Sequence, residues 1–167
     1  YPSNKYRDEN VFSENACAEL CVSVGNRKMD FNFFVVWNKL YKRDIWERLR
    51  FDENLKSAED RWALFHVYCA VEKIAVCPQM LYYYRQNEGL SSPNNKNHEF
   101  DYIVGYRMLE EARRRRWNVQ PYIETVVVHT SGKIRSCIKN EQKEAYWSAH
   151  KEFKMLWCDI KDVLKSA

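Results

Sequence analysis

Three long runs in the C-terminal part of the chain carry apolar residues at intervals of three and four. They cover residues 99–117, 120–140 and 141–164. This spacing places apolar side chains along one side of an α-helix, so each run predicts a helix. Only four glycines and four prolines occur in 167 residues, which also favours long regular elements with little linker between them. Residues 98–167 are therefore expected to form an all-helical extension.

The first part of the chain, residues 1–97, has a mixed pattern. Residues 33–40 hold the densest run of β-branched and aromatic residues, which predicts a buried strand leading into a short turn of helix. Apolar positions at helical spacing between residues 59 and 72 predict an amphipathic helix. Residues 73–78 and 80–86 then predict two short strands. This order of elements favours an α/β domain over residues 1–97.

The composition narrows the functional classes. No run of about 18 or more apolar residues is present, so no membrane-spanning segment is predicted. No charged-then-apolar leader opens the chain, so secretion gains no support. A net charge of +4 and a pI of 8.7 are far from the dense Lys/Arg coverage of a dedicated nucleic-acid binder, and no nucleic-acid partner is expected. The expected location is the cytoplasm, with peripheral contact at the inner face of the membrane as a further expectation.

The cysteines match neither a CxxC framework nor a zinc-binding pattern. They are Cys17, Cys21, Cys69, Cys77, Cys137 and Cys158. Reduced and mostly buried thiols are therefore expected, and no metal site is predicted in this chain.

Two interpretations compete for Glu59 and Asp60, which open the helix predicted from residue 59. Ser57 followed by an acid three positions later fits a capping box, and acids in a first turn suit the positive end of the helix dipole. A carboxylate held at a helix start beside a cleft can also accept a proton from a hydroxyl nucleophile. Spacing alone favours the capping role and leaves the catalytic one open.

Several short strings occur in a fixed order around this pair. They are Trp37-Asn38-Lys39-Leu40-Tyr41-Lys42, Arg50-Phe51, Glu59-Asp60, and Tyr82-Tyr83-Tyr84-Arg85 followed by a Gly/Ser loop. Together they resemble the second half of the family 2 glycosyltransferases of the GT-A fold, over roughly residues 13–93. The resemblance implies an α/β class, namely the acceptor-side, C-terminal part of a GT-A-type domain with a few strands plus helices, over residues 1–97. The all-helical extension over residues 98–167 follows it.

The resemblance also implies a reaction. Such an enzyme moves a sugar from a nucleotide-sugar donor to a glycan or a lipid-linked acceptor with inversion, in bacterial surface-polysaccharide biosynthesis. By resemblance, Asp60 is the general base that deprotonates the acceptor hydroxyl, and Glu59 supports it. Inverting displacement needs one base on the acceptor side and charge neutralisation on the diphosphate side.

Four more residues are implied to bind substrate. Arg85 follows a predicted strand, where a guanidinium can pair with phosphate oxygens, and Ser91 lies in the loop beyond it. By resemblance, Asn38 and Lys39 are either structural or near the acceptor, without a chemical step. An ordinary solvated arginine beside a loop is the alternative for Arg85.

The donor side of such an enzyme is not found in the chain. The family holds a divalent metal, Mn or Mg, against the diphosphate with an Asp-x-Asp motif. No Asp-x-Asp occurs, and the nearest pattern, Asp159-Ile160-Lys161-Asp162, has a different spacing. The metal is expected for the whole enzyme, with its ligands outside this chain. Because the donor-binding half with Asp-x-Asp is missing, we expect the chain to be inactive alone, and its first residue, Tyr1, favours a portion of a longer protein.

Other partners follow from apolar and basic surfaces. An uncovered strand edge at residues 33–37 would favour self-association into a homo-oligomer. The run Arg113–Arg116 with Trp117 could rest on anionic lipid headgroups, although cations at a helix C-terminus are usually just solvated. A different functional class stays open, in which the chain is a non-catalytic helical interaction module. In that class Glu59 and Asp60 act only as a cap.

Overall fold

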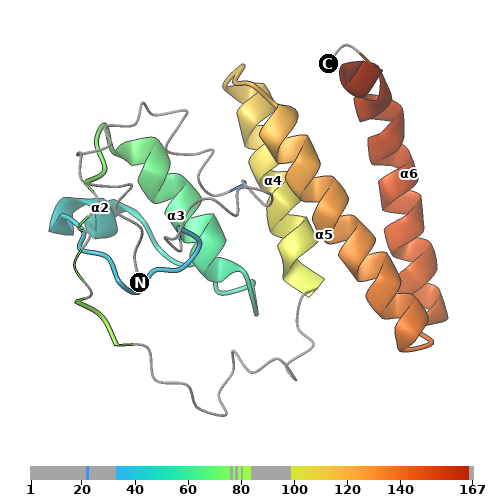
Figure 1. The fold of residues 1–167 in the computed structure, drawn as a ribbon, viewed down its shortest axis with the longest axis horizontal. Helices are drawn as coiled ribbons and strands as arrows, with labels where there is room; N and C mark the ends of the chain where they lie inside the picture. Colours follow the sequence, from blue (N-terminus) through green and yellow to red (C-terminus); the bar gives the residue numbers. More distant parts are fainter. Residues whose placement is uncertain are drawn as a thin grey trace. The chain divides into compact units, whose positions relative to one another are not determined.

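A computed structural model of the chain describes Val22 and residues 33–75, 77, 79, 81–83 and 99–165. These residues form helices joined by turns and irregular segments (Figure 1). The helices are α2 (Arg43–Arg48), α3 (Glu59–Ala70), α4 (Glu99–Arg114), α5 (Gln120–Lys139) and α6 (Lys143–Lys165). Each lies where the sequence predicted helix, so the helical predictions are confirmed.

The predicted α/β class is wrong for the part of the chain that the structure describes. Residues 33–40 form turns, bends and irregular backbone, and residues 73–75 and 81–83 are irregular as well. No strand occurs among the described residues, so the few strands expected of a GT-A-type fragment are not found there.

The backbone of residues 33–36 is bonded to side chains in place of a neighbouring strand. The Tyr68 hydroxyl donates to the Phe33 carbonyl at 2.9 Å, and the Tyr41 hydroxyl donates to the Val36 carbonyl at 3.0 Å. The Val36 amide donates to the Asp60 carboxylate at 3.3 Å. β-Branched and aromatic residues favour a strand only where another strand pairs with their backbone. Here side chains satisfy those groups, so the segment does not need a sheet.

The chain divides into two compact units, and the first holds the described residues between 33 and 83. Its centre is α3, on which Leu64 and Phe65 are fully buried. The other buried apolar residues among the described residues of this unit are Phe33, Leu55, Ala63, Val67 and Tyr68. Burying a large apolar side chain stabilises a fold by about 1.5–3 kcal/mol, so α3 contributes much of the stability of the described part of this unit.

The second unit contains Val22 and α4, α5 and α6. In it α5 packs against both α4 and α6, which lie beside it in Figure 1. Gly105 of α4 permits a close approach, because a Cβ there would lie 3.4 Å from a methyl group of Val126 on α5. The Thr125 hydroxyl on α5 donates to the Val22 carbonyl. The buried apolar residues of the unit are Val22, Val104, Met108, Leu109, Ala112, Tyr122, Ile123, Val126, Cys137, Ala149 and Leu156.

The cysteines in the described part of the chain are thiols that are not joined in disulfides, as expected. Cys137 is buried and Cys69 is half-buried, whereas Cys77 and Cys158 are exposed. The expectation that the thiols are mostly buried therefore fails for two of these four positions.

Two helices end in the same hydrogen-bonded motif without glycine. After α4, the Trp117 amide donates to the Ala112 carbonyl at 2.9 Å. Arg116, the residue just before Trp117, has φ of 59°. After α5, the Gln142 amide bonds the Cys137 carbonyl at 2.9 Å and Glu141 has φ of 55°. Glycine usually occupies this left-handed position, because a Cβ there is costly. A chain with four glycines thus ends two helices at some energetic cost.

Replacing Glu141 by glycine should stabilise the second unit. Glu141→Gly relieves the left-handed strain and should raise the free energy of unfolding by about 1 kcal/mol, measured by urea denaturation. The matched control is Glu144→Gly, where glycine enters the first turn of α6 and should lower the free energy of unfolding by about 1 kcal/mol. Equal effects of the two substitutions would contradict this interpretation of the helix end.

Candidate functional site

The helix α3 begins at an unusual residue. Its N-cap is Ala58, which has φ of 60° and ψ of 12°, so the helix starts one residue later than a capping box with Ser57 as N-cap requires. The Ala58 carbonyl accepts the first helical bond, from the Trp62 amide at 3.1 Å. Glu59 and Asp60 occupy the first turn, where the helix dipole favours negative charge. The left-handed backbone conformation of Ala58 therefore determines how the chain enters α3, and with it the positions of the Glu59 and Asp60 carboxylates.

The carboxylate of Asp60 makes a tertiary contact. Its Oδ2 accepts a hydrogen bond from the Val36 amide, 24 residues earlier in the chain, at 3.3 Å. One residue further along α3, the Arg61 guanidinium lies over the Phe34 ring, 4.9 Å from its centroid. These contacts fix residues 33–36 against the start of α3, and with them the orientation of the Asp60 carboxylate.

Asn38 and Lys39 lie directly after this contact. The Lys39 ammonium donates to the Val35 carbonyl at 2.6 Å and to the Asn38 side-chain oxygen at 3.0 Å. Asn38 has φ of 58°, a conformation that asparagine tolerates better than most residues. Asn38 and Lys39, both predicted to bind substrate, thus belong to the segment that bonds Asp60. Their contacts hold the backbone of that segment in place.

A further contact joins this segment to the last string of the sequence pattern. The Trp37 and Tyr82 rings are stacked, with centroids 5.2 Å apart and planes at 16°. Tyr82 is partly exposed, and Tyr83 beside it is almost fully exposed. No role was predicted for Trp37 or Tyr82. Both are aromatic residues within the strings that resemble the family, and this was the signal in the sequence that the two strings lie in contact. The other predicted substrate-binding residues, Arg85 and Ser91, lie outside the described residues.

No metal-binding arrangement accompanies Asp60. Among the described residues, no group of three or more His, Cys, Asp and Glu side chains is placed to hold a metal ion. The second unit contains a hollow of about 360 Å³, at the turn between α5 and α6. It is lined by Cys137, Ile138, Glu141, Gln142, Lys143, Tyr146 and Trp147.

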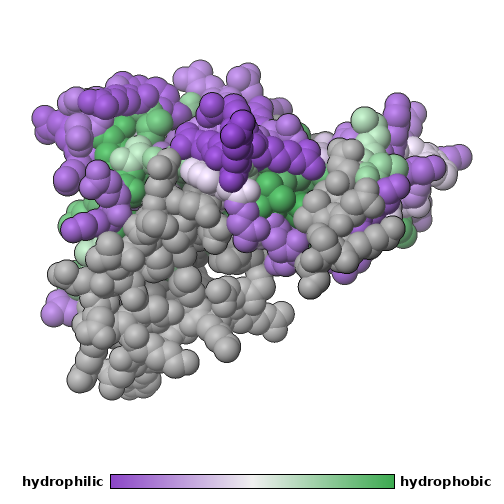
Figure 2. Space-filling model, turned by 90° about the horizontal axis from the view of Figure 1, so that it is seen from above, coloured by the Kyte–Doolittle hydropathy of each residue, from purple (hydrophilic) through white to green (hydrophobic). Residues whose placement is uncertain are grey.

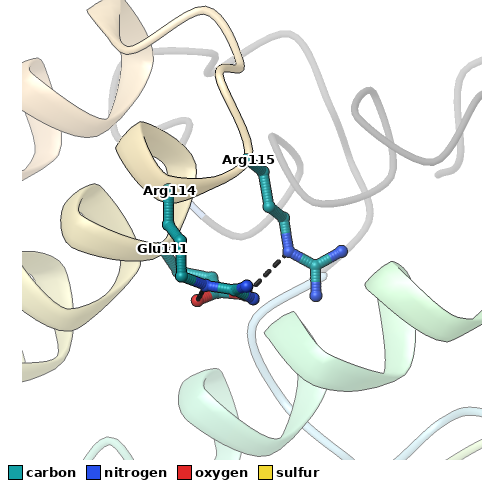
Figure 3. Close-up of polar contacts among 3 residues, drawn as sticks. All are labelled: Glu111, Arg114 and Arg115. Carbon is teal, nitrogen blue, oxygen red and sulfur yellow. Dashed lines mark hydrogen bonds and ion pairs between the residues drawn. The ribbon is translucent and has the colours of Figure 1, made fainter.

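The arginine run after α4 is paired with acids of the same helix. Arg114 and Arg115 both bond Glu111, at 2.5 Å and 2.7 Å (Figure 3), and Arg113 bonds Glu110 at 2.8 Å. The hydrogen bond from Arg114, with that from Arg115 and the charges of both, lowers the pKa of Glu111 from 4.5 to about 2, while burial opposes the shift. The same contact raises the pKa of Arg114. Two glutamates thus neutralise half of the four positive charges of Arg113–Arg116, the run that suggested lipid contact.

None of the known protein-family models matches the chain, and no curated protein or solved structure is significantly similar to it. Within the residues that the structure describes, no helix has the length and apolar character needed to cross a membrane.

Removing the Tyr68 hydroxyl should destabilise the first unit. Tyr68→Phe leaves the buried Phe33 carbonyl without this donor and should lower the free energy of unfolding by about 1–2 kcal/mol, measured by chemical denaturation. Tyr41→Phe is the matched control. Its bond to Val36 is only part-buried, so water can replace the hydroxyl and the loss should be smaller. A loss for Tyr68→Phe no greater than for Tyr41→Phe would contradict the proposed role of these bonds.

The ion pairs of Glu111 should make the stability of the second unit depend on pH. A carboxylate whose pKa is depressed on folding stabilises the folded state above its unfolded pKa, and this contribution is lost as pH falls through the folded pKa. At neutral pH, Glu111→Gln should therefore lower the Tm modestly, as expected of a side chain that is 17% exposed. The difference from wild type should shrink between about pH 4.5 and about pH 2.

Thermal unfolding followed by circular dichroism across this pH range measures the effect. Glu53→Gln, which removes one exposed carboxylate outside α4, controls for the change in net charge. A Glu111→Gln difference that is constant across the range would rule out the ion pairs as its cause.

Proposed function

We propose that the chain is the acceptor-side part of an inverting glycosyltransferase in which Asp60 is the general base. The acceptor is a hydroxyl of a glycan or a lipid-linked sugar, and the donor is a nucleotide sugar. The proposal starts from the ordered strings that resemble family 2 glycosyltransferases. It does not depend on a sheet, since the described residues contain none.

The observation that carries the proposal is that two adjacent residues, Val36 and Trp37, make contacts with two strings that lie far from them in sequence. Val36, next to the Trp37-Asn38-Lys39 string, bonds Asp60, and Trp37 stacks on Tyr82. The segment that bonds Asp60 thus also contacts Tyr82 of the last string, and this proximity supports a shared site.

The geometry of Asp60 suits a base. Its Oδ2 is used by the Val36 amide, while Oδ1 has no hydrogen-bond donor among the described residues. In this proposal one oxygen fixes the carboxylate, and the other accepts a proton from a hydroxyl that approaches. The position in the first turn of α3 stabilises the negative charge that a base needs. Glu59, one residue earlier in the same turn, adds negative potential and supports this role.

The cap-only interpretation has less support. The N-cap is Ala58, whose side chain cannot bond an amide, and the Asp60 carboxylate reaches a residue 24 positions away. The donor-side residues and a Mn or Mg ion would belong to parts of the enzyme other than the described residues. The proposal therefore assigns no step to a metal.

Substituting Asp60 tests the proposal in the natural polypeptide that contains this chain. In Asp60→Asn the side-chain amide would still offer an oxygen to the Val36 amide, so this variant should fold normally, yet it could not accept the proton. Sugar transfer from UDP- and GDP-sugars to glycan and lipid-linked acceptors, measured as nucleoside diphosphate release, should fall by about 10²–10⁴-fold. Glu59→Gln should cause a smaller loss.

The controls separate catalysis from folding. Glu53→Gln removes an exposed carboxylate of the same unit and should leave transfer unchanged. Circular dichroism and Tm should match wild type for all three variants. Full activity of Asp60→Asn would refute the assignment of the base, and absence of transfer by the wild-type polypeptide with every donor would refute the transferase class. In that case binding of a partner chain that survives Asp60→Asn would favour the helical interaction module.

A further inference from the structure

One face of α6 carries exposed basic and aromatic residues. Trp147, Lys151, Lys154, Cys158 and Lys161 follow one another at intervals of four and three, so they share one side of the helix. All five are exposed, and together they are called the lysine face. At 1.5 Å of rise per residue, the face extends over about 21 Å.

The other side of α6 provides its packing. Ala149 and Leu156 are each 3% exposed, and the Tyr106 hydroxyl of α4 donates to the Glu152 carbonyl at 3.3 Å. These residues lie on positions of the helical turn other than those of the lysine face. The core of the second unit therefore does not account for the composition of the lysine face.

The charges of the lysine face are not neutralised along the helix. No acidic residue lies three or four positions from Lys151, Lys154 or Lys161. Lys151 and Lys154 are themselves three apart, an arrangement of like charges that destabilises a helix. By contrast, Glu110 and Glu111 pair with the arginines at the end of α4. The lysine face is therefore the stronger candidate for an anionic partner.

Large apolar side chains lie on or beside these lysines. Trp147 is 56% exposed, Met155 63% and Trp157 46%. Exposed hydrophobic residues on one face of the molecule form separate areas amid hydrophilic ones (Figure 2). A helix that mixes lysine with exposed tryptophan is typical of elements that lie in a membrane interface, where the rings enter the headgroup layer and the ammonium groups meet phosphate.

We propose that the lysine face of α6 binds the surface of an anionic lipid bilayer. The lysine stems and the two tryptophan rings would lie along the headgroup layer, with the ammonium groups directed to lipid phosphates. A nucleic acid would use the positive charge and leave Met155 and Trp157 without an apolar surface. A second copy of the chain would bring two lysine rows together. The proposal is independent of chemistry at Asp60.

Vesicle flotation tests the proposal with phosphatidylcholine vesicles, alone and mixed with an equal part of phosphatidylglycerol. The full chain should bind the mixed vesicles, bind phosphatidylcholine far more weakly, and release as salt is raised. Substituting Lys151, Lys154 and Lys161 together by Gln should weaken binding by on the order of 100-fold, since each lysine near an anionic surface contributes about fivefold. Replacing Trp147 and Trp157 by Ala should weaken binding with all the lysines present.

A matched triple variant controls for net charge. Lys42, Lys56 and Lys73 are exposed lysines of the other unit, and their joint substitution by Gln should leave vesicle binding almost unchanged. Circular dichroism should show intact helices in every variant. Equal losses in the two triple variants, or tryptophan variants that bind as wild type, would overturn the proposal. Tighter, lysine-dependent binding to duplex DNA would favour a nucleic acid, and a dimer in light scattering that the tryptophan variants abolish would favour a second copy.

Discussion

Side-chain hydrogen bonds fix an irregular backbone segment of the first unit against α3. Residues 33–36 contain buried and half-buried apolar side chains, so their carbonyl and amide groups must find partners away from water. Tyr68 and Asp60, both on α3, provide two of those partners. The bond that satisfies the Val36 amide is also the bond that orients the Asp60 carboxylate. Structure and proposed chemistry therefore depend on the same contact.

Because the chain has only four glycines, other residues adopt the left-handed backbone conformation that glycine usually takes. Asn38, Ala58, Arg116 and Glu141 have positive φ, in each case near an element boundary or a bend. Such positions cost about 1–3 kcal/mol each and persist only when surrounding contacts hold them. Asn38 and Ala58 lie two residues from Val36 and Asp60, the partners of the central hydrogen bond. The strain at these two sites is thus held by the contact that defines the candidate site.

The sequence predicted the helices because their signal is local. Periodicity along one segment is enough to define α3 to α6, and each was found. The strand at residues 33–40 was wrong because β-propensity depends on a partner strand, and here Tyr68, Tyr41 and Asp60 take that partner's place. The start of α3 at Ala58 had no signal in the sequence, since nothing marks an alanine for the left-handed region.

The other differences concern the side of α6 on which a residue lies and the acids that pair with the arginine run. The run 141–164 was expected to place its apolar side chains along one side of a helix. Trp147 and Leu156 are nine residues apart, however, which turns them to opposite sides of that helix, and Trp147 is exposed whereas Leu156 is buried. The arginine run was expected to contact anionic lipid, but three of its arginines pair with Glu110 and Glu111, which lie three or four positions before their partners. Its contact with Trp117 is local as well, since the Arg115 guanidinium lies 5.0 Å from that ring centroid.

Net charge is a poor guide to partners when the acids are unevenly placed. A value of +4 describes the whole chain, but it averages an arginine cluster that is half neutralised by two glutamates with a lysine row that has no acid three or four positions away. The lysine row extends over about 21 Å, which exceeds the Debye length of about 8–10 Å. If the acceptor is lipid-linked, attachment through α6 would confine the Asp60 unit to the surface that carries its substrate. Confinement raises the effective concentration of acceptor without any new contact at the base, so weak acceptor binding at Asp60 would be sufficient.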